Sequence, residues 1–149
     1  VKSDIYMQGY VKVKESRIIE THDFTKCKES DFASILAYSE DNNIINSPCF
    51  KLYKSSIVNT NRVRFDIRTS YGEDHLFSLD YCRYISSAHF TLSHGYNYRI
   101  SVGESLSHRR IPLDDILFYT RESRKKQTVI IDKLSSVSFS IQVPSGRSS

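Results

Sequence analysis

Strict alternation of apolar and polar residues constrains the fold of this chain more than any other feature. It is clearest in residues 137–143, where Val, Phe, Ile and Val occupy every second position. A period of two places the apolar side chains on one face, as in a strand that is half buried in a sheet. The same pattern recurs in residues 63–68 and 96–102. We therefore predict strands in all three ranges and expect the last two to be antiparallel.

Weaker strand patterns and polar turns fill most of the remaining chain. The additional candidate strands are residues 5–14, 17–24, 35–38, 76–82, 115–120 and 128–131. Only residues 49–56, which follow Ser47 and Pro48, indicate a helix. Because alternating strands must bury their apolar face against another layer, we predict an all-β fold, a two-sheet β-sandwich with at most one or two short helices. Its core is expected to include Phe65, Ile67, Phe139 and Ile141.

Length and composition indicate one globular domain. The chain has 149 residues, of which 39% are hydrophobic and 26% are charged, values typical of globular proteins. We assign residues 1–143 to the domain and residues 144–149 to a tail, natural or introduced by cloning. No apolar run approaches the roughly 18 residues of a membrane span. The net charge is +4, but its basic residues are scattered apart from 108–110 and 121–126, so we expect no nucleic-acid partner.

Motifs for catalysis and metal binding are sparse. The sequence contains no G-x-S-x-G, H-E-x-x-H, P-loop or G-x-G-x-x-G motif, so no hydrolase or nucleotide-binding signature is present. Cys27, Cys49 and Cys82 have no C-x-x-C spacing and no neighbouring histidine cluster, which argues against a metal site. They are either reduced thiols of an intracellular protein, or one disulfide and one remaining thiol. We expect no catalytic residue, metal or cofactor.

One segment suggests an enzyme as an alternative. Residues 104–112 resemble the segment that follows the catalytic glutamate of pertussis-toxin-like ADP-ribosyltransferases, with Glu104 in the place of that glutamate. Those enzymes also have an arginine on an early strand and a Ser-Thr-Ser strand, which this sequence lacks. A second alternative, a pleckstrin-like intracellular binding module, is suggested by residues 32–79.

A resemblance to one viral family covers most of the chain. The pieces that carry it are residues 22–27, 46–48, 62–70, 107–111, 114–116 and 137–141, with sequences HDFTKC, NSP, RVRFDIRTS, SHRRI, DDI and VSFSI. In this order they resemble the secreted chemokine-binding proteins of poxviruses. The chain is most similar to the SECRET domain of viral tumour-necrosis-factor decoy receptors, which implies a secreted β-sandwich that sequesters host chemokines and blocks receptor engagement. An upstream receptor-like domain is also implied.

The resemblance further implies a binding face. Its residues would be Tyr10, Thr60, Arg62, Arg64, Asp66, Tyr119, Arg121 and Glu122. On a strand over residues 60–68, the alternation would place one set of side chains on one exposed face: Thr60, Arg62, Arg64, Asp66 and Arg68. Tyr119 is the expected anchor. A secreted protein would also have one disulfide within the chain and one unpaired or externally paired thiol.

Overall fold

The computed structural model describes residues 3–28, 31–100, 110–134 and 136–142. Seven strands and four helices lie in these ranges. In chain order they are β1 (Ile5–Met7), β2 (Tyr10–Lys14), β3 (Arg17–His22), α1 (Phe32–Asp41), β4 (Lys51–Tyr53), α2 (Ser55–Thr60), α3 (Glu73–Cys82), β5 (Ser87–Thr91), β6 (Tyr96–Arg99), α4 (Leu113–Leu134) and β7 (Ser138–Gln142).

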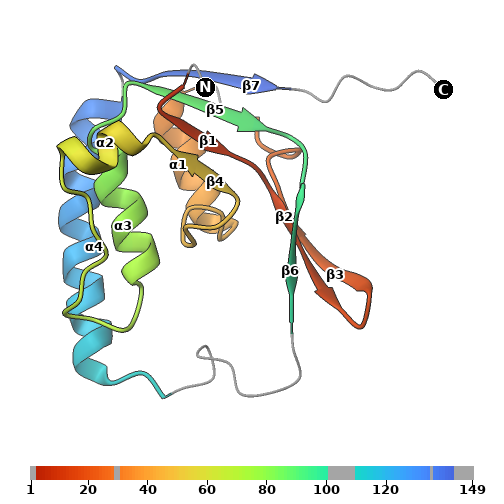
Figure 1. The fold of residues 1–149 in the computed structure, drawn as a ribbon, viewed down its shortest axis with the longest axis horizontal. Helices are drawn as coiled ribbons and strands as arrows, with labels where there is room; N and C mark the ends of the chain where they lie inside the picture. Colours follow the sequence, from red (N-terminus) through yellow and green to blue (C-terminus); the bar gives the residue numbers. More distant parts are fainter. Residues whose placement is uncertain (1–2, 29–30, 101–109, 135, 143–149) are drawn as a thin grey trace.

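The strands form two mixed sheets. Two stretches of chain, β1 to β2 and β5 to β6, run from the first sheet into the second. The first sheet has the order β4-β1-β5-β7, and the second has the order β3-β2-β6. Strand β1 is antiparallel to β4 and parallel to β5, while β5 is parallel to β7. The parallel neighbours β1 and β5 continue into β2 and β6, which are again parallel. The molecule therefore bends where this pair of strands passes from one sheet to the other (Figure 1).

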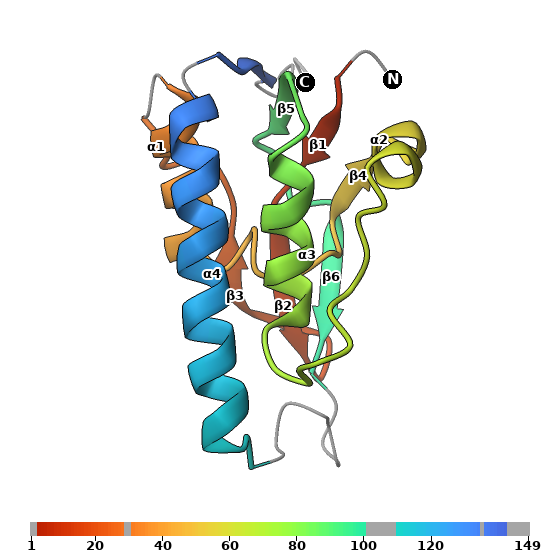
Figure 2. The ribbon, with the colours of Figure 1, turned by 90° about the vertical axis from the view of Figure 1, so that its left-hand side faces the viewer.

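Helices α1, α3 and α4 lie together on one side of the strands (Figures 1 and 2). Strand β5 directs Ala88 and Phe90 into the core, and the two side chains are 1% and 0% exposed. The Phe90 ring meets Phe32 of α1 at a centroid distance of 6.1 Å. Tyr53 of β4 packs edge-on against Tyr81 of α3 at 4.8 Å. The core is thus a layer between strands and helices.

The structure contradicts the predicted β-sandwich, because four helices occupy much of the chain. Residues 76–82, predicted as a strand, belong to α3, and residues 35–38 belong to α1. Seven of the ten residues of α3 are buried, including all of 76–82 except Asp80. A short apolar run of this kind has no polar face, so its periodicity does not separate a buried helix from a buried strand.

Helix α4 combines two predicted strands and the basic run between them. Residues 115–120 and 128–131 both lie in this 22-residue helix. Ser123, Ile130 and Leu134 are buried at helical spacing, whereas Arg121 and Arg124 are exposed. Asp114 and Asp115 occupy the first turn, where carboxylates interact favourably with the helix dipole. The basic run thus lies within one helix, where Arg121, Arg124 and Lys125 are exposed and Ser123 is buried.

Residues 63–68 alternate in sequence but do not form a strand. Arg62 adopts a left-handed conformation with φ of 53°, and the Asp66 carboxylate accepts a hydrogen bond of 3.0 Å from the backbone N–H of Arg68. This segment is therefore a turn without a strand partner. Val63 is buried as expected, but Phe65 is 47% and Ile67 is 97% exposed. The prediction that Phe65 and Ile67 are core residues is wrong.

Other predictions are confirmed in part. Strands do form at Tyr96–Arg99 and Ser138–Gln142, but Tyr96–Arg99 pairs parallel with β2 rather than antiparallel. Phe139 and Ile141 are partly buried against the core. The predicted helix over residues 49–56 is instead β4 followed by the start of α2. Glu104 and the tail 144–149 lie outside the described residues.

The predicted disulfide is not formed. Cys27, Cys49 and Cys82, which all lie in the described ranges, are free thiols. Cys82 is buried in α3, while Cys49 is exposed. Burial raises the pKa of the Cys82 thiol to about 12, which leaves this sulfur protonated and unreactive at neutral pH.

Candidate functional site

Two regions that the sequence analysis assigned to one binding face meet on the first half of α4. The Arg68 guanidinium lies 4.8 Å from the centre of the Phe118 ring. The Ser70 hydroxyl donates a hydrogen bond of 2.9 Å to Asp115. These contacts hold the chain between α2 and α3 against α4. Residues far apart in the sequence therefore share one surface, although no strand brings them together.

Exposed apolar side chains lie on both segments that make this contact. Ile67 is 97% exposed, Leu113 is 68% exposed and Leu117 is 54% exposed. Phe65 is half exposed and stacks on Phe77 at a centroid distance of 4.4 Å, so its ring is held in place. We call Phe65, Ile67, Arg68, Leu113, Leu117 and Arg121 the α4 surface. Its combination of aromatic, aliphatic and arginine side chains is typical of protein interfaces.

Two carboxylates beside the α4 surface, Asp66 and Glu122, are paired with cations. Arg68 donates to Asp66 at 2.6 Å, and Lys125 donates to Glu122 at 2.8 Å. These partners lower the pKa of both carboxyl groups, so both are ionised and compensated at neutral pH. Arg121 is exposed and makes no ion pair with another described residue. The α4 surface therefore combines apolar side chains with charges of both signs, since the exposed Asp114 and the exposed Arg121 lie on the same helix.

The remaining predicted contact residues are distributed over different surroundings. Thr60 ends α2 and is exposed, as is Arg62. Arg64 donates to the backbone carbonyl groups of Val58 and Val63 at 3.2 and 2.7 Å. These three residues precede Phe65 in the chain.

Tyr10 is separated from the other predicted contact residues. It is only 6% exposed, and its ring stacks between His22 at 4.6 Å and Phe50 at 4.5 Å. Burial also raises the pKa of its hydroxyl group to about 12. The side chain belongs to the interior where the two sheets meet, so Tyr10 does not complete the α4 surface.

Tyr119, the expected anchor, takes part in a polar connection between three helices. Its hydroxyl lies 2.8 Å from Nδ1 of His75 in α3, and Nε2 of His75 lies 3.2 Å from Glu40 in α1. Gln127 of α4 donates to both Glu40 oxygens at 3.1 Å. We call these four residues the helix bridge. Tyr119 is therefore half buried and engaged, and we expect its replacement to affect stability first.

The conformation of Gly72 explains how Tyr119 fits against α3. Gly72 has a φ of 70°, and a Cβ placed there would lie 2.2 Å from the Tyr119 ring. A residue with a side chain at position 72 would therefore clash with the Tyr119 ring. The positive φ is a second reason for glycine at this position. Gly72 thus permits the close contact of the chain before α3 with α4.

The helix bridge has the order carboxylate, imidazole and phenol, but its electrostatics favour a structural role. Burial raises the pKa of the Tyr119 hydroxyl, which disfavours an ionised nucleophile. Burial also acts to raise the pKa of Glu40, yet the hydrogen bonds from His75 and Gln127 outweigh it and lower the pKa. The sequence analysis missed Glu40 and His75 because they are 35 residues apart and belong to no motif.

Within the described residues, no group of three or more His, Cys, Asp or Glu side chains is arranged to hold a metal ion. None of the described helices is both long and apolar enough to span a membrane.

Comparison with known proteins gives no family-model match and no curated relative.

Proposed function

We propose that this domain is a binding module that captures a protein partner through the α4 surface rather than an enzyme. The observation that carries this proposal is the 97% exposure of Ile67 beside the contact of Arg68 with Phe118. An isolated exposed aliphatic residue is ordinary, but here several lie on the two segments that the Arg68–Phe118 contact joins. Exposed patches with a polar rim mark interaction sites.

The energetics of the patch favour a partner that covers it. Burying an aliphatic side chain of this size contributes roughly 1.5–3 kcal/mol. Ile67, Leu113 and Leu117 are at least half exposed, so much of this free energy is still available to an interface. Phe65 is fixed by its stacking on Phe77, which reduces the entropy that its ring would lose on binding.

The resemblance to the poxvirus proteins suggests host chemokines as the ligands. We therefore propose that the domain is a secreted viral decoy that captures a secreted chemokine. The charges refine the choice of ligand. Asp66 and Glu122 are paired with Arg68 and Lys125, whereas Arg121 is exposed. Asp114 on the same helix is exposed as well, so the local charges favour neither a strongly acidic nor a strongly basic chemokine through long-range attraction.

The test is a binding screen of purified chemokines by surface plasmon resonance, followed by two matched variants. Ile67→Ser changes a side chain that is 97% exposed, and Leu52→Ser changes one on β4 that is 62% exposed. Both should leave the fold intact. We expect Ile67→Ser to weaken binding about tenfold, as loss of a moderate interface contact does, and Leu52→Ser to have no effect.

The possible outcomes separate the ligand from the surface. If no chemokine binds the natural protein, the chemokine assignment is wrong. If a chemokine binds equally well to the natural protein and to Ile67→Ser, a different surface is used. A stronger effect of Leu52→Ser would place the contact on the edge of the first sheet.

A further inference from the structure

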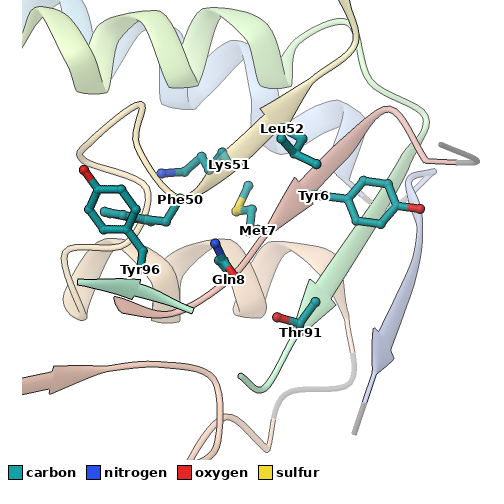
Figure 3. A pocket seen from close by; sticks show the side chains of 8 residues that line it. All are labelled: Tyr6, Met7, Gln8, Phe50, Lys51, Leu52, Thr91 and Tyr96. Atoms are coloured by element: carbon teal, nitrogen blue, oxygen red, sulfur yellow. The ribbon is translucent and has the colours of Figure 1, made fainter. Parts of the chain in front are cut away.

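A hollow lies where β1 and β5 leave the first sheet and enter the second. Its volume is about 350 Å³, within the usual range of small-molecule sites. Figure 3 shows Phe50 and Tyr96 on one side, Tyr6 and Thr91 on the other, and Gln8 between them. In open α/β sheets, ligands bind beyond the carboxyl ends of parallel strands. Gln8 directly follows β1, and Thr91 ends β5.

The aromatic wall of the hollow is held in place from behind. Phe50 is 7% exposed and stacks on Tyr10 at a centroid distance of 4.5 Å. Tyr96 meets Phe50 at 5.5 Å with an interplanar angle of 63°. These contacts fix the rings without a ligand. A planar ligand would therefore meet a preformed apolar surface at little conformational cost.

The hollow presents no available charge. No carboxylate lines it, and Lys51 is its only basic side chain. The Lys51 ammonium group instead contacts the backbone carbonyl groups of Ile44 and Ser47. Burial also lowers the pKa of this group to about 7. Because an ionic ligand would find no counter-charge here, the lining favours a neutral ligand.

Gln8 supplies the unmatched polar group. Its backbone N–H donates to Phe50 at 3.2 Å, but its side-chain amide has no hydrogen-bond partner among the described residues. A Cβ at Gly95 would lie 3.0 Å from the Gln8 side-chain oxygen, so the glycine leaves room for the amide. A carboxamide offers a donor and an acceptor side by side, which matches an amide-like edge of a ring.

We propose that this hollow binds a neutral planar heterocycle whose ring edge carries an adjacent hydrogen-bond donor and acceptor, as in a nucleobase. The ring stacks against Tyr96, which is braced by the buried Phe50, and its edge pairs with the Gln8 amide. The chemistry of the lining selects this class over anions, which would need the engaged Lys51, and over aliphatic ligands, which would leave the amide unpaired. This site is separate from the α4 surface.

The proposal is tested by NMR titration of the ¹⁵N-labelled protein with uracil and with 1,3-dimethyluracil, which keeps the ring but has no N–H donor. Uracil should shift the side-chain amide signals of Gln8 and the backbone signals of Thr91 and Tyr96 in a saturable way. Because the paired hydrogen bonds are lost, 1,3-dimethyluracil should bind about tenfold more weakly.

Two variants locate the interaction. Gln8→Met has a similar length but no amide, and should weaken uracil binding about tenfold, while Ile67→Ser should leave it unchanged. The dispersion of the NMR spectrum shows whether each variant is folded. Gln8→Glu provides a second test, because a carboxylate has no N–H group to donate to the ligand. Absence of saturable shifts at about 10 mM, a level that detects even weak binding, would overturn the proposal. Equal binding of the two ligands, or unchanged binding by both Gln8 variants, would do the same.

Discussion

At the scale of single residues, Asp4 shows how one carboxylate can join distant parts of the chain. It is 8% exposed and lies just before β1. It accepts hydrogen bonds from the backbone N–H groups of Ser86 at 2.9 Å and Ser87 at 3.2 Å, and from Lys54 at 3.1 Å. Burial acts to raise its pKa, but these donors outweigh burial and lower the pKa to about 2. The charged form is therefore the one that stabilises the fold.

Replacing Asp4 by Asn should lower the free energy of unfolding by about 1–3 kcal/mol at pH 7, because a charged acceptor is lost. A carboxyl group with a lowered pKa stabilises the protein above its ordinary value of 3.8, and this stabilisation is lost as pH falls toward 2. When the pH is lowered from 3.8 to about 2, the free energy of unfolding should therefore fall less for Asp4→Asn than for the natural protein. Urea unfolding at several pH values measures both effects.

The control for this prediction is Asp114→Asn, since Asp114 is exposed in the first turn of α4. It should change stability by less than about 1 kcal/mol. Identical acid sensitivity of Asp4→Asn and the natural protein would show that Asp4 does not carry the charge-dependent stabilisation.

At the scale of elements, the helix bridge determines how α1, α3 and α4 are held together. Apolar contacts alone leave a hollow between α1 and α4, lined by Ala33, Ala37 and Ile131. Glu40 and Gln127 join the two helices at one end of this hollow. The polar contacts thus supplement a loosely packed helix pair.

Glu40→Ala should destabilise the protein by about 1–3 kcal/mol, because it leaves the buried His75 and the Gln127 amide without their acceptor. Its matched control is the neighbouring Asp41→Ala, which changes an exposed residue and should cost less than about 0.5 kcal/mol. Thermal and urea unfolding provide the measurement. Equal effects of the two changes would mean that the helix bridge does not contribute to stability.

At the scale of the whole molecule, the core lies between the strands and the helices. Phe90 is fully buried on the interior strand β5. It packs on Phe24 at 5.1 Å and on Phe32 at 6.1 Å. Phe65 is half exposed outside the sheets. A β-sandwich built on residues 63–68 would make Phe65 a core residue, so these two phenylalanines distinguish the two folds.

Phe90→Ala should lower the free energy of unfolding by about 3–5 kcal/mol through lost burial and the cavity that remains. Phe65→Ala should cost about 1 kcal/mol, since half of its ring is already in water. Urea unfolding of the two variants compares these values directly. A larger loss for Phe65→Ala than for Phe90→Ala would contradict the arrangement of the core described above.

The sequence by itself determined the strand Ser138–Gln142, whose alternation reflects one exposed and one partly buried face. It also determined the strand Tyr96–Arg99, although three of its four side chains are exposed. Pattern alone could not identify α3, because seven of its ten residues are buried and so short an apolar run does not separate a helix from a strand. It also misassigned residues 63–68, whose alternation has no partner strand, since pairing depends on distant segments. Only the tertiary structure brought Arg68 onto Phe118 and joined Glu40, His75 and Tyr119 from three helices. Such contacts arise from the packing of elements, which local periodicity does not encode.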